Sequence, residues 1–423
     1  MKDMALTREI DKEILERLSI WAKGEKAGPV RMVILPTNRC NLRCIFCGGV
    51  YEREAPNKWF PNKFSWEDEL SDEKWIEIIR EASKMGVREW LISGGGEPMI
   101  RSKAVVEMLN TIKELNKNSV IELSTNSTLI TKEIAEQIVL SGCDYLQTGV
   151  DGPNAVIHDF LRGRKGAFKK TIKAINYLAE AKKKFGRDKP IIKVHVVLNK
   201  KNYDKLHEIL KVIHKAGANF FAVAAMRIYG GGQEEAINKA GIRMSESERK
   251  AVHEIWRKVE NLAKEYNMQL GPAFYEGLEQ VEGRVEYKVE KKFGDEKIDK
   301  FLSAFCYAPF YGCIIDWAGN VGPCPCAGSV KNIWDNNVKE RSFKEIWYGE
   351  FFNKVRETML DGKPIELEKI IPHMNPEKLR GLPLHPCEAC GINVERKEIS
   401  QRLSRYLRGE SFEKILNLEV KHG

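Results

Sequence analysis

The chain has 423 residues, with 43% hydrophobic and 30% charged residues and a formal charge of +9. This length allows two or three domains with real cores, and the composition is ordinary for a globular enzyme. No apolar run reaches the roughly 18 residues of a membrane span, and the first 25 residues lack the apolar core of a secretory signal. We therefore expect a cytoplasmic protein without a transmembrane segment. The cations are spread along the chain, which indicates a solvated surface rather than a nucleic-acid partner or an acidic substrate.

The first predicted element is an amphipathic helix over residues 5–24. Apolar residues recur there at helical spacing, among them Leu6, Ile10, Leu18 and Trp21. We expect this helix to cap the fold as an N-terminal unit, residues 1–29.

From about residue 30 the pattern alternates between apolar strands and amphipathic helices. Six buried strands are predicted, at 30–36, 88–93, 120–125, 145–150, 191–198 and 220–228. Among the helices, 71–86 opens with a Ser cap and closes on Gly. This α/β alternation implies a parallel sheet, either a partial barrel or an open doubly wound sheet, over residues 30–230. In both folds, ligands bind at the C-terminal ends of the strands.

The rest of the chain has a different texture. Residues 231–300 read as a mostly helical, highly charged connecting segment. Residues 301–423 are expected to form a further domain, which begins with cysteine-rich turns and one hairpin and ends in a basic, solvated helix after residue 395.

The ten cysteines are unevenly placed. Three lie at 40–47, six lie between 306 and 390, and Cys143 stands alone. A reducing compartment favours metal binding or catalysis over structural disulfides. The sequence therefore predicts two metal-bearing regions.

The first group, in "TNRCNLRCIFC" (37–47), follows the first predicted strand directly. Its ligand candidates are Cys40, Cys44 and Cys47. Thiolates select zinc or iron–sulfur clusters, and structural zinc usually takes four ligands. Three thiolates on a cubane instead leave one iron open to a small molecule. Ordinary cysteines or an incomplete zinc site are the alternatives.

This spacing, with the aromatic Phe46 before the last cysteine, resembles the radical S-adenosylmethionine (SAM) enzymes. The resemblance covers roughly residues 30 to 230 and implies a partial (β/α)6 TIM-like barrel. It implies a 4Fe–4S cluster whose open iron chelates SAM, reductive cleavage to a 5′-deoxyadenosyl radical, and hydrogen abstraction from a substrate. It also implies an electron donor such as ferredoxin or flavodoxin. The cofactors carry this radical chemistry because no side chain can supply it.

Other stretches agree with the same family. "SGGGEP" (93–98) is similar to the family's GGE element, which implies that Gly95, Gly96 and Glu97 receive the methionine ammonium. A plain tight turn is the alternative there. In "STN" (124–126), the resemblance implies that Ser124 and Asn126 contact the ribose and the methionine carboxylate.

Three candidates lie further along the chain. In "GVDGPNAVIHDFLRG" (149–163), the resemblance makes Arg162 the partner of the SAM carboxylate, and a surface ion pair with Asp159 is the alternative. Asn199 and Met226 are weaker candidates for the walls of the ribose and adenine sites.

The second cysteine region predicts a hairpin, "YGCIIDWAGNVGPCPC" (311–326), with its turn at 318–320. Further along, Cys387-x2-Cys390 has the spacing of a chelate pair. The remaining cysteines of this region are Cys306, Cys313, Cys324 and Cys326.

This arrangement resembles the C-terminal cluster domain of radical SAM enzymes called SPASM or, in a shorter form, twitch. The family pattern is met by Cys306, Gly319, Cys324, Cys387 and Cys390, which implies one auxiliary 4Fe–4S cluster. No cysteine follows Cys390, so a second complete auxiliary cluster is not expected. Cys313 and Cys326 are left over: Cys313 could replace another ligand, and a buried thiol or a substrate contact are the alternatives for both. Structural zinc is the alternative for the whole region.

These features predict a mechanism class, a radical SAM enzyme, and leave the catalytic residue unassigned. Peptide or protein modification ranks first among the expected tasks. Small-molecule oxidation, including that of a cofactor precursor, ranks second, and lipid C–C coupling third. A non-enzymatic iron–sulfur electron carrier is the competing class, but such a carrier would ligate every iron with cysteine.

Overall fold

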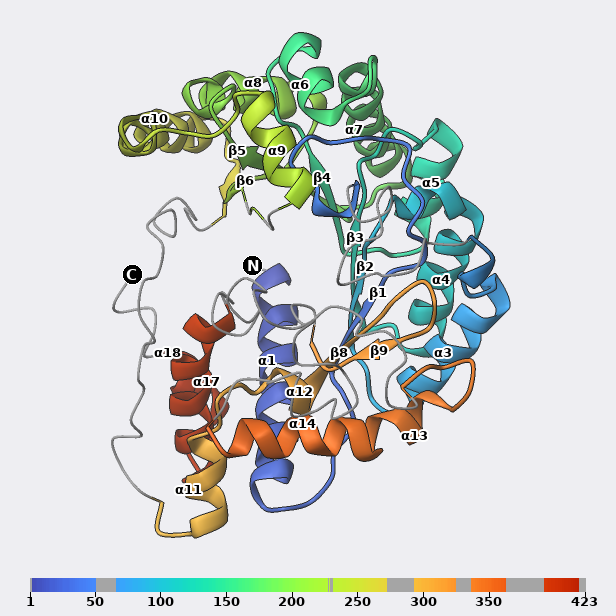
Figure 1. The fold of residues 1–423 in the computed structure, drawn as a ribbon, viewed down its shortest axis with the longest axis vertical. Coiled ribbons are helices and arrows are strands. Elements are labelled where there is room, and N and C mark those ends of the chain that lie inside the picture. The colour runs from blue at the N-terminus through green and yellow to red at the C-terminus, as the bar shows by residue number, and fades with distance from the viewer. Residues whose placement is uncertain are drawn as a thin grey trace.

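The computed structural model describes residues 2–50, 66–226, 228, 231–271, 293–324, 336–362 and 392–417. Within these residues, a single sheet forms the centre of the molecule, with nine strands in the order β7-β6-β5-β4-β3-β2-β1-β8-β9 (Figure 1). Each pair of neighbours from β8 through β1 to β7 is parallel. The parallel sheet expected from the strand–helix alternation is therefore confirmed.

The six predicted strands all form, and five of them end within two residues of the expected positions. They are β1 Arg31–Ile34, β2 Glu89–Ile92, β3 Val120–Ser124, β4 Tyr145–Gly149, β5 Ile191–Leu198 and β6 Phe220–Ala225. The prediction for the sixth was too long, because β6 ends at Ala225 and Met226 lies beyond it.

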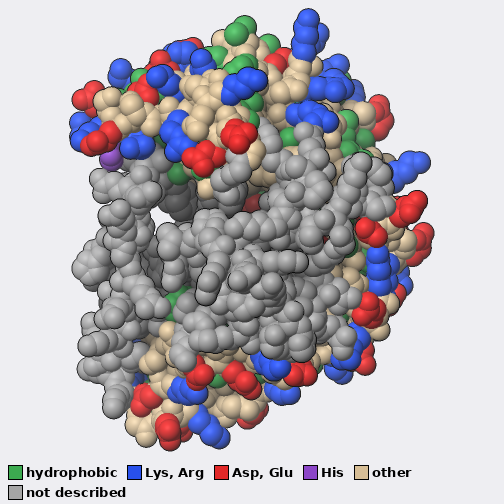
Figure 2. Space-filling view, in the orientation of Figure 1, with side chains coloured by type: hydrophobic (Ala, Val, Ile, Leu, Met, Phe, Trp, Pro, Cys, Tyr) green, Lys and Arg blue, Asp and Glu red, His purple; other side chains and the backbone are tan. Residues whose placement is uncertain are grey.

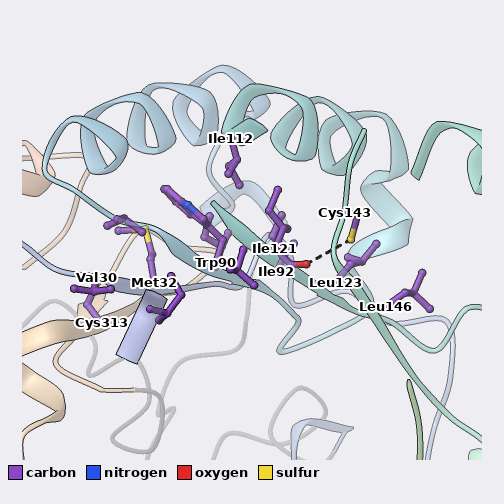
Figure 3. Close-up of a cluster of buried hydrophobic side chains, with 14 of the residues drawn as sticks. Val30, Met32, Trp90, Ile92, Ile112, Ile121, Leu123, Cys143, Leu146 and Cys313 are labelled. Carbon is purple, nitrogen blue, oxygen red and sulfur yellow. Dashed lines mark hydrogen bonds between the residues drawn. The ribbon is translucent and has the colours of Figure 1, made fainter. Parts of the chain in front are cut away.

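Helices cover the convex face of this sheet (Figure 1). They are α3 Asp72–Lys84, α4 Ser102–Leu115, α5 Lys132–Leu140, α6 Ala155–Arg162, α7 Ala167–Phe185 and α8 Leu206–Ala216. Ser71 caps α3 through a bond that its side chain accepts from the Lys74 amide, as the sequence predicts. Figure 3 shows the core between helices and sheet, where Met32, Trp90, Ile121 and Leu146 pack with their neighbours.

The opposite, concave face of the sheet carries the alternate residue of each strand. These side chains are half-buried and several are charged or polar; they include Arg31, Glu89, Glu122, Lys193 and His195. A strand with one apolar and one polar face is unusual for a parallel sheet, whose strands are normally buried on both sides. The concave face is therefore built to meet something other than hydrophobic core.

The cysteine-rich hairpin joins the main sheet at its β1 edge. Strand β8 (Gly312–Ile315) runs parallel to β1, and β9 (Val321–Gly322) folds back antiparallel to β8. The turn between them contains Gly319 at φ +91°, a left-handed conformation that glycine adopts without strain. The predicted hairpin is confirmed, and its place beside β1 is new.

The first helix of the chain packs against helices from its C-terminal part. Helix α1 (Lys2–Ala22) packs against α11 (Glu296–Leu302), α12 (Ala308–Tyr311) and α17 (Ile392–Leu407). Four further helices are α9 Gly231–Lys239, α10 Glu246–Glu265, α13 Phe343–Trp347 and α14 Glu350–Leu360. The remaining elements are short: η1 Trp66–Asp68, η2 Pro98–Arg101, η3 Tyr203–Lys205, β7 Gln269–Leu270 and α18 Phe412–Asn417. Among the described helices, none combines the length and the apolar character that crossing a membrane requires.

Candidate active site

The cysteine loop (residues 37–47) leaves the carboxyl end of β1. Cys40, Cys47 and Phe46 pack around Cys44, which is buried, while Cys40 and Cys47 are half-buried. In the described chain, no three Cys, His, Asp or Glu side chains converge closely enough to hold a single metal ion. Structural zinc usually takes four ligands, whereas three thiols can hold an iron–sulfur cubane that has one open iron.

Helices α6 and α9 hold the cysteine loop by its backbone. The amides of Arg43 and Ile45 donate to the carbonyls of Arg162 (3.1 Å) and Leu161 (3.0 Å) at the end of α6. From α9, the buried Gln233 donates its side-chain amide to the Phe46 carbonyl at 2.7 Å. Sequence reasoning missed Gln233, because no local pattern marks a glutamine that reaches a loop far away in the chain.

Arg162 lies directly beside the thiols. Its Nη1 donates to Cys44 Sγ at 3.8 Å, and its guanidinium lies 5.5 Å from the centre of the Phe46 ring. Its Nε pairs with Asp151 Oδ2 at 2.6 Å. Burial raises the pKa of the Cys44 thiol to about 12, and the charge of Arg162 opposes that shift. A cation at this point, with its side chain 12% exposed, suits an anionic ligand at the loop.

The ion pair considered for Arg162 at the sequence level involves the wrong partner. Asp159 instead accepts hydrogen bonds from the Gly166 and Phe168 amides, at 2.6 and 2.7 Å. Asp151, which pairs with Arg162, is completely buried. Burial raises the pKa of its carboxyl, while Arg162 and the Val197 amide lower it. Arg162 therefore belongs to an ion pair inside the protein, with Asp151, and not to an ion pair on the surface.

Glu97 ties two loops together. One oxygen accepts from Thr125 Oγ1 and from the Met99 amide (3.0 Å), and the other accepts from the Asn126 amide at 2.7 Å. The side chain is only 2% exposed, and burial raises its pKa against the opposing effect of these hydrogen bonds. The carboxylate is thus engaged within the protein, linking the loop after β2 to the loop after β3.

Gly95 and Gly96 make room for other parts of the protein. A Cβ at Gly96 would lie 2.0 Å from the Arg39 carbonyl oxygen, and one at Gly95 would lie 2.7 Å from the Trp317 ring. These two glycines therefore let the cysteine loop and the hairpin approach the loop after β2.

The loop after β3 also joins the cysteine loop. Asn126 Nδ2 donates to Asn41 Oδ1 at 2.9 Å, and Asn41 Nδ2 donates to Thr128 Oγ1 at 2.8 Å. Ser124 faces the concave side, where Gln147 Nε2 approaches its hydroxyl at 3.5 Å. The structure thus brings the loops after β1, β2 and β3 together at one edge of the sheet.

Asn199, the candidate for the ribose wall, lies in the turn after β5, and its role there stays a prediction. It is completely buried, its Oδ1 accepts from the Lys201 amide, and its Nδ2 donates to the Val197 carbonyl. These local bonds form the turn after β5. Met226 follows β6, is half-buried, and packs against the same small apolar cluster as Phe46 and Ile45 of the cysteine loop.

Comparison with known proteins gives two family matches within the chain. The Radical SAM superfamily matches residues 34–216, which contain the cysteine loop, and an iron–sulfur cluster-binding domain named SPASM matches residues 306–370. The chain contains a radical SAM domain. The resemblance to radical SAM enzymes, predicted from the Cys-x3-Cys-x2-Cys spacing, is therefore confirmed.

Relatives align with this radical SAM enzyme over most of its length. An AdoMet-dependent heme synthase of Methanosarcina barkeri is 27% identical over 76% of this chain and 83% of its own. A PqqA peptide cyclase of Granulibacter bethesdensis is 24% identical over 78% and 77%. The crystal structure of Streptococcus suis SuiB has a TM-score of 0.55 at 19% identity, over 78% of this chain and 68% of SuiB. The structural likeness confirms the partial-barrel fold.

The cofactors follow from the two domain matches. The enzyme uses a 4Fe–4S cluster with SAM, and its C-terminal region binds an auxiliary iron–sulfur cluster. Of the predicted auxiliary ligands, Cys306 is half-buried and Cys324 is buried just after β9. Cys326, Cys387 and Cys390 lie outside the described residues. Cys313 instead packs in the main core with Val30 and Met32 (Figure 3).

The burial of Cys313 favours one of the three alternatives that the sequence left open. It is fully buried on β8, and burial raises the pKa of its thiol. A thiol surrounded by apolar side chains behaves as a small hydrophobic group. Its position argues for a buried thiol rather than a ligand.

On the concave face of the enzyme, the strand-borne charges occur in pairs. Arg31 Nε lies 2.7 Å from Glu89 Oε2, and Lys193 Nζ lies 2.6 Å from Glu122 Oε2. The Lys193 ammonium also lies 3.9 Å from the centre of the Tyr145 ring. Burial and the charge of Lys193 lower the pKa of His195 next to it, whereas Glu122 raises it. The face is thus polar and aromatic, with its cations balanced by carboxylates.

Proposed function

We propose that this radical SAM enzyme modifies a peptide or protein substrate, which it binds against the concave face of the sheet. The charge balance of that face carries the proposal. Lys193 is paired with Glu122, and Tyr145 adds an aromatic surface. Arg31 is paired with Glu89 at the start of the first strands, where both interact with Asp11 of α1. Such a surface can accept amide groups and mixed side chains. The similarity to a PqqA peptide cyclase over 78% of the chain supports the same assignment.

A second candidate is a heme-forming reaction, favoured by the 27% identity to an AdoMet-dependent heme synthase. Heme precursors carry several carboxylates, and their recognition requires cations that are free to pair with them. The pairing of Arg31 and Lys193 with Glu89 and Glu122 therefore ranks this candidate second.

Each part of the site has a proposed task. Cys40, Cys44 and Cys47 would hold the 4Fe–4S cluster, and Arg162 would face the anionic carboxylate of SAM. Glu97 and Asn126 would act by fixing the three loops against each other. Cys306, Cys324, Cys387 and Cys390 would hold the auxiliary cluster, without Cys313. When bound, cluster and SAM supply a 5′-deoxyadenosyl radical that abstracts hydrogen from substrate.

An anaerobic assay tests this function. The protein is reconstituted with iron and sulfide, reduced with dithionite and given SAM, and 5′-deoxyadenosine is measured by chromatography. We expect the wild type to form it and Cys44→Ser to lose it. Cys143→Ser is the matched control, because Cys143 is an equally buried thiol whose Sγ donates to the Ile121 and Tyr145 carbonyls, as a serine hydroxyl can.

Substrate dependence separates the two candidates. A pool of peptides encoded beside the gene is compared with a heme precursor, and mass spectrometry follows hydrogen loss or a new bond. Peptide modification is the expected result. A product formed from the heme precursor alone would support the second candidate, and equal loss of 5′-deoxyadenosine in both cysteine variants would contradict the assignment of the cysteine loop.

A further inference from the structure

An exposed patch over helix α6 combines apolar and basic side chains. Val156 and Phe160, one helical turn apart on α6, are 82% and 46% exposed. The segment that follows carries the exposed cations Arg164, Lys165 and Lys169, and the exposed Lys201 places its Nζ 6.0 Å from the centre of the Phe160 ring. Figure 2 shows several basic side chains, with some hydrophobic and acidic ones among them, at the top of the molecule, where Figure 1 places α6 and α7. We call these six residues the α6 patch.

The charge of the α6 patch is not neutralised by its own segment. Between residues 152 and 170 the sequence contains one acidic residue, Asp159. Its two carboxylate oxygens already accept from the Gly166 and Phe168 amides. Lys169 also lies in the first turn of α7, which has no acidic residue, so the helix dipole adds to the positive potential. Repulsion between these cations lowers the stability of the fold. Residues that lower stability without a compensating contact are typical of functional surfaces.

The α6 patch lies next to the cysteine loop. Phe160 precedes Leu161 and Arg162, whose carbonyls accept hydrogen bonds from Ile45 and Arg43 at 3.0 and 3.1 Å. A short path of covalent and hydrogen bonds therefore connects the surface of α6 to the segment that carries Cys44 and Cys47. A partner bound at the patch would come close to the cluster without entering the concave face.

We propose that the α6 patch is the docking surface for an acidic, low-potential electron-carrier protein, which delivers one electron to the cluster. The inference rests on the proposed function, because only a cluster that must be reduced needs such a partner. A small apolar centre with a basic rim fits the weak, short-lived interfaces of electron-transfer partners. Complementary charge would steer the acidic carrier to the patch and set its rate of association.

Two pairs of matched variants test the patch, with flavodoxin and its NADPH-dependent reductase as the probe. Arg164→Glu/Lys165→Glu reverses two basic charges of the patch, and Arg257→Glu/Lys258→Glu makes the same change on the exposed side of α10. Phe160→Ala removes the apolar centre, and Leu140→Ala removes a side chain of similar exposure (53%) at the end of α5. All four variants are expected to form 5′-deoxyadenosine at the wild-type rate when dithionite is the reductant.

With flavodoxin, the variants should separate. The patch reversal should raise the flavodoxin concentration needed for half-maximal rate roughly ten-fold or more, as expected when electrostatic steering is lost. Phe160→Ala should raise it a few-fold, and both α10 and α5 controls should match the wild type. At about 1 M salt, charges are screened beyond about 3 Å. The wild type should then need a flavodoxin concentration close to that of the reversal variant.

Direct binding of flavodoxin to the reconstituted enzyme, measured by calorimetry at low salt, distinguishes two kinds of failure. If the proposed function is wrong, dithionite gives no 5′-deoxyadenosine with the wild type. If the docking surface is wrong, the patch and control variants bind flavodoxin equally well. Equal binding, or equal flavodoxin-driven rates, in all variants would overturn the inference.

Discussion

At the scale of single residues, the pair Asp151–Arg162 has the largest electrostatic consequence in the site. Both groups are withdrawn from water, and the Arg162 guanidinium also reaches Cys44 Sγ and the Phe46 ring. A buried ion pair adds little to stability as a whole, but removal of one partner leaves an uncompensated charge. Asp151 therefore holds Arg162 at the cysteine loop.

The variant Asp151→Asn tests this role. Asparagine can still accept the bond that Asp151 receives from the Val197 amide at 2.8 Å, but it removes the negative charge. We expect the free energy of unfolding to fall by roughly 3 kcal/mol or more, and the affinity for SAM to fall with it. Chemical unfolding and equilibrium binding of SAM to the reconstituted protein measure the two effects.

Glu136→Gln is the control for this variant. It breaks the pair between Glu136 and Lys184, whose side chains are 23% and 55% exposed, and such a surface pair contributes under about 1 kcal/mol. Equal losses of unfolding free energy in the two variants would show that burial of the Asp151–Arg162 pair does not increase its contribution to stability.

At the scale of elements, the β8–β9 hairpin links the auxiliary region to the SAM site. Strand β8 extends the sheet beyond β1, and the Trp317 ring packs against Gly95 after β2. The Trp317 carbonyl also accepts from the Leu70 amide at 2.7 Å. The two cluster-binding regions therefore share one sheet and one contact between loops.

Gly95→Ala should disrupt this contact. The new methyl group would lie 2.7 Å from the Trp317 ring and 2.8 Å from Asn38 Oδ1. Overpacking of this kind costs roughly 1–3 kcal/mol, and we expect a lower midpoint of chemical unfolding together with weaker SAM binding. Gly312→Ala, at the start of β8, is the control, because its methyl group would meet nothing closer than 3.6 Å. A Gly95→Ala protein as stable as Gly312→Ala would refute the close packing.

At the scale of the whole molecule, helix α1 packs against helix α17 beside the first strands of the sheet. Asp11 of α1 lies 3.9 Å from Arg402 of α17, and its carboxyl also interacts with Glu398, Arg31 and Glu89. Burial raises the pKa of Asp11 to about 6, Glu89 and Glu398 contribute in the same direction, and Arg402 and Arg31 oppose the shift. The joining of α1, α17 and the first strands therefore creates a carboxyl group that resists ionisation.

This group makes stability depend on pH. A carboxyl whose pKa is higher in the folded chain than in the unfolded chain binds its proton more tightly when folded. Its stabilising contribution is complete below the ordinary pKa of 3.8 and is lost as the pH rises through about 6. Asp11→Asn should therefore be more stable than the wild type at pH 7, and the difference should shrink toward pH 4.

Chemical unfolding of both proteins between pH 4 and 8, under the same anaerobic conditions, measures this difference. Asp204→Asn is the control, because Asp204 is an exposed residue that pairs with its neighbour Lys205, and it should follow the wild-type curve. A loss of stability in Asp11→Asn at pH 7 would show that the pairing with Arg402 outweighs the cost of burial.

The sequence by itself determined the strand–helix alternation, the hairpin, the Ser cap of α3 and the family to which the cysteine spacing belongs. These features are local: hydrophobic periodicity reports which face of each element is buried, and caps, turns and chelate spacings involve residues close together in the chain. The thiols, Phe46, the two glycines and Arg162 could be placed at one edge of the sheet for the same reason, since parallel strands end there.

Only the tertiary structure decided which partners these residues meet. Arg162 pairs with Asp151 and not with Asp159. The Asn199 side chain forms a hydrogen bond within its own turn, and Cys313 packs in the hydrophobic core. Strand β8 pairs with β1 although almost three hundred residues separate them. Such contacts depend on register and packing between distant segments, and the free energy that selects them comes from burying whole faces at once, which no local pattern records.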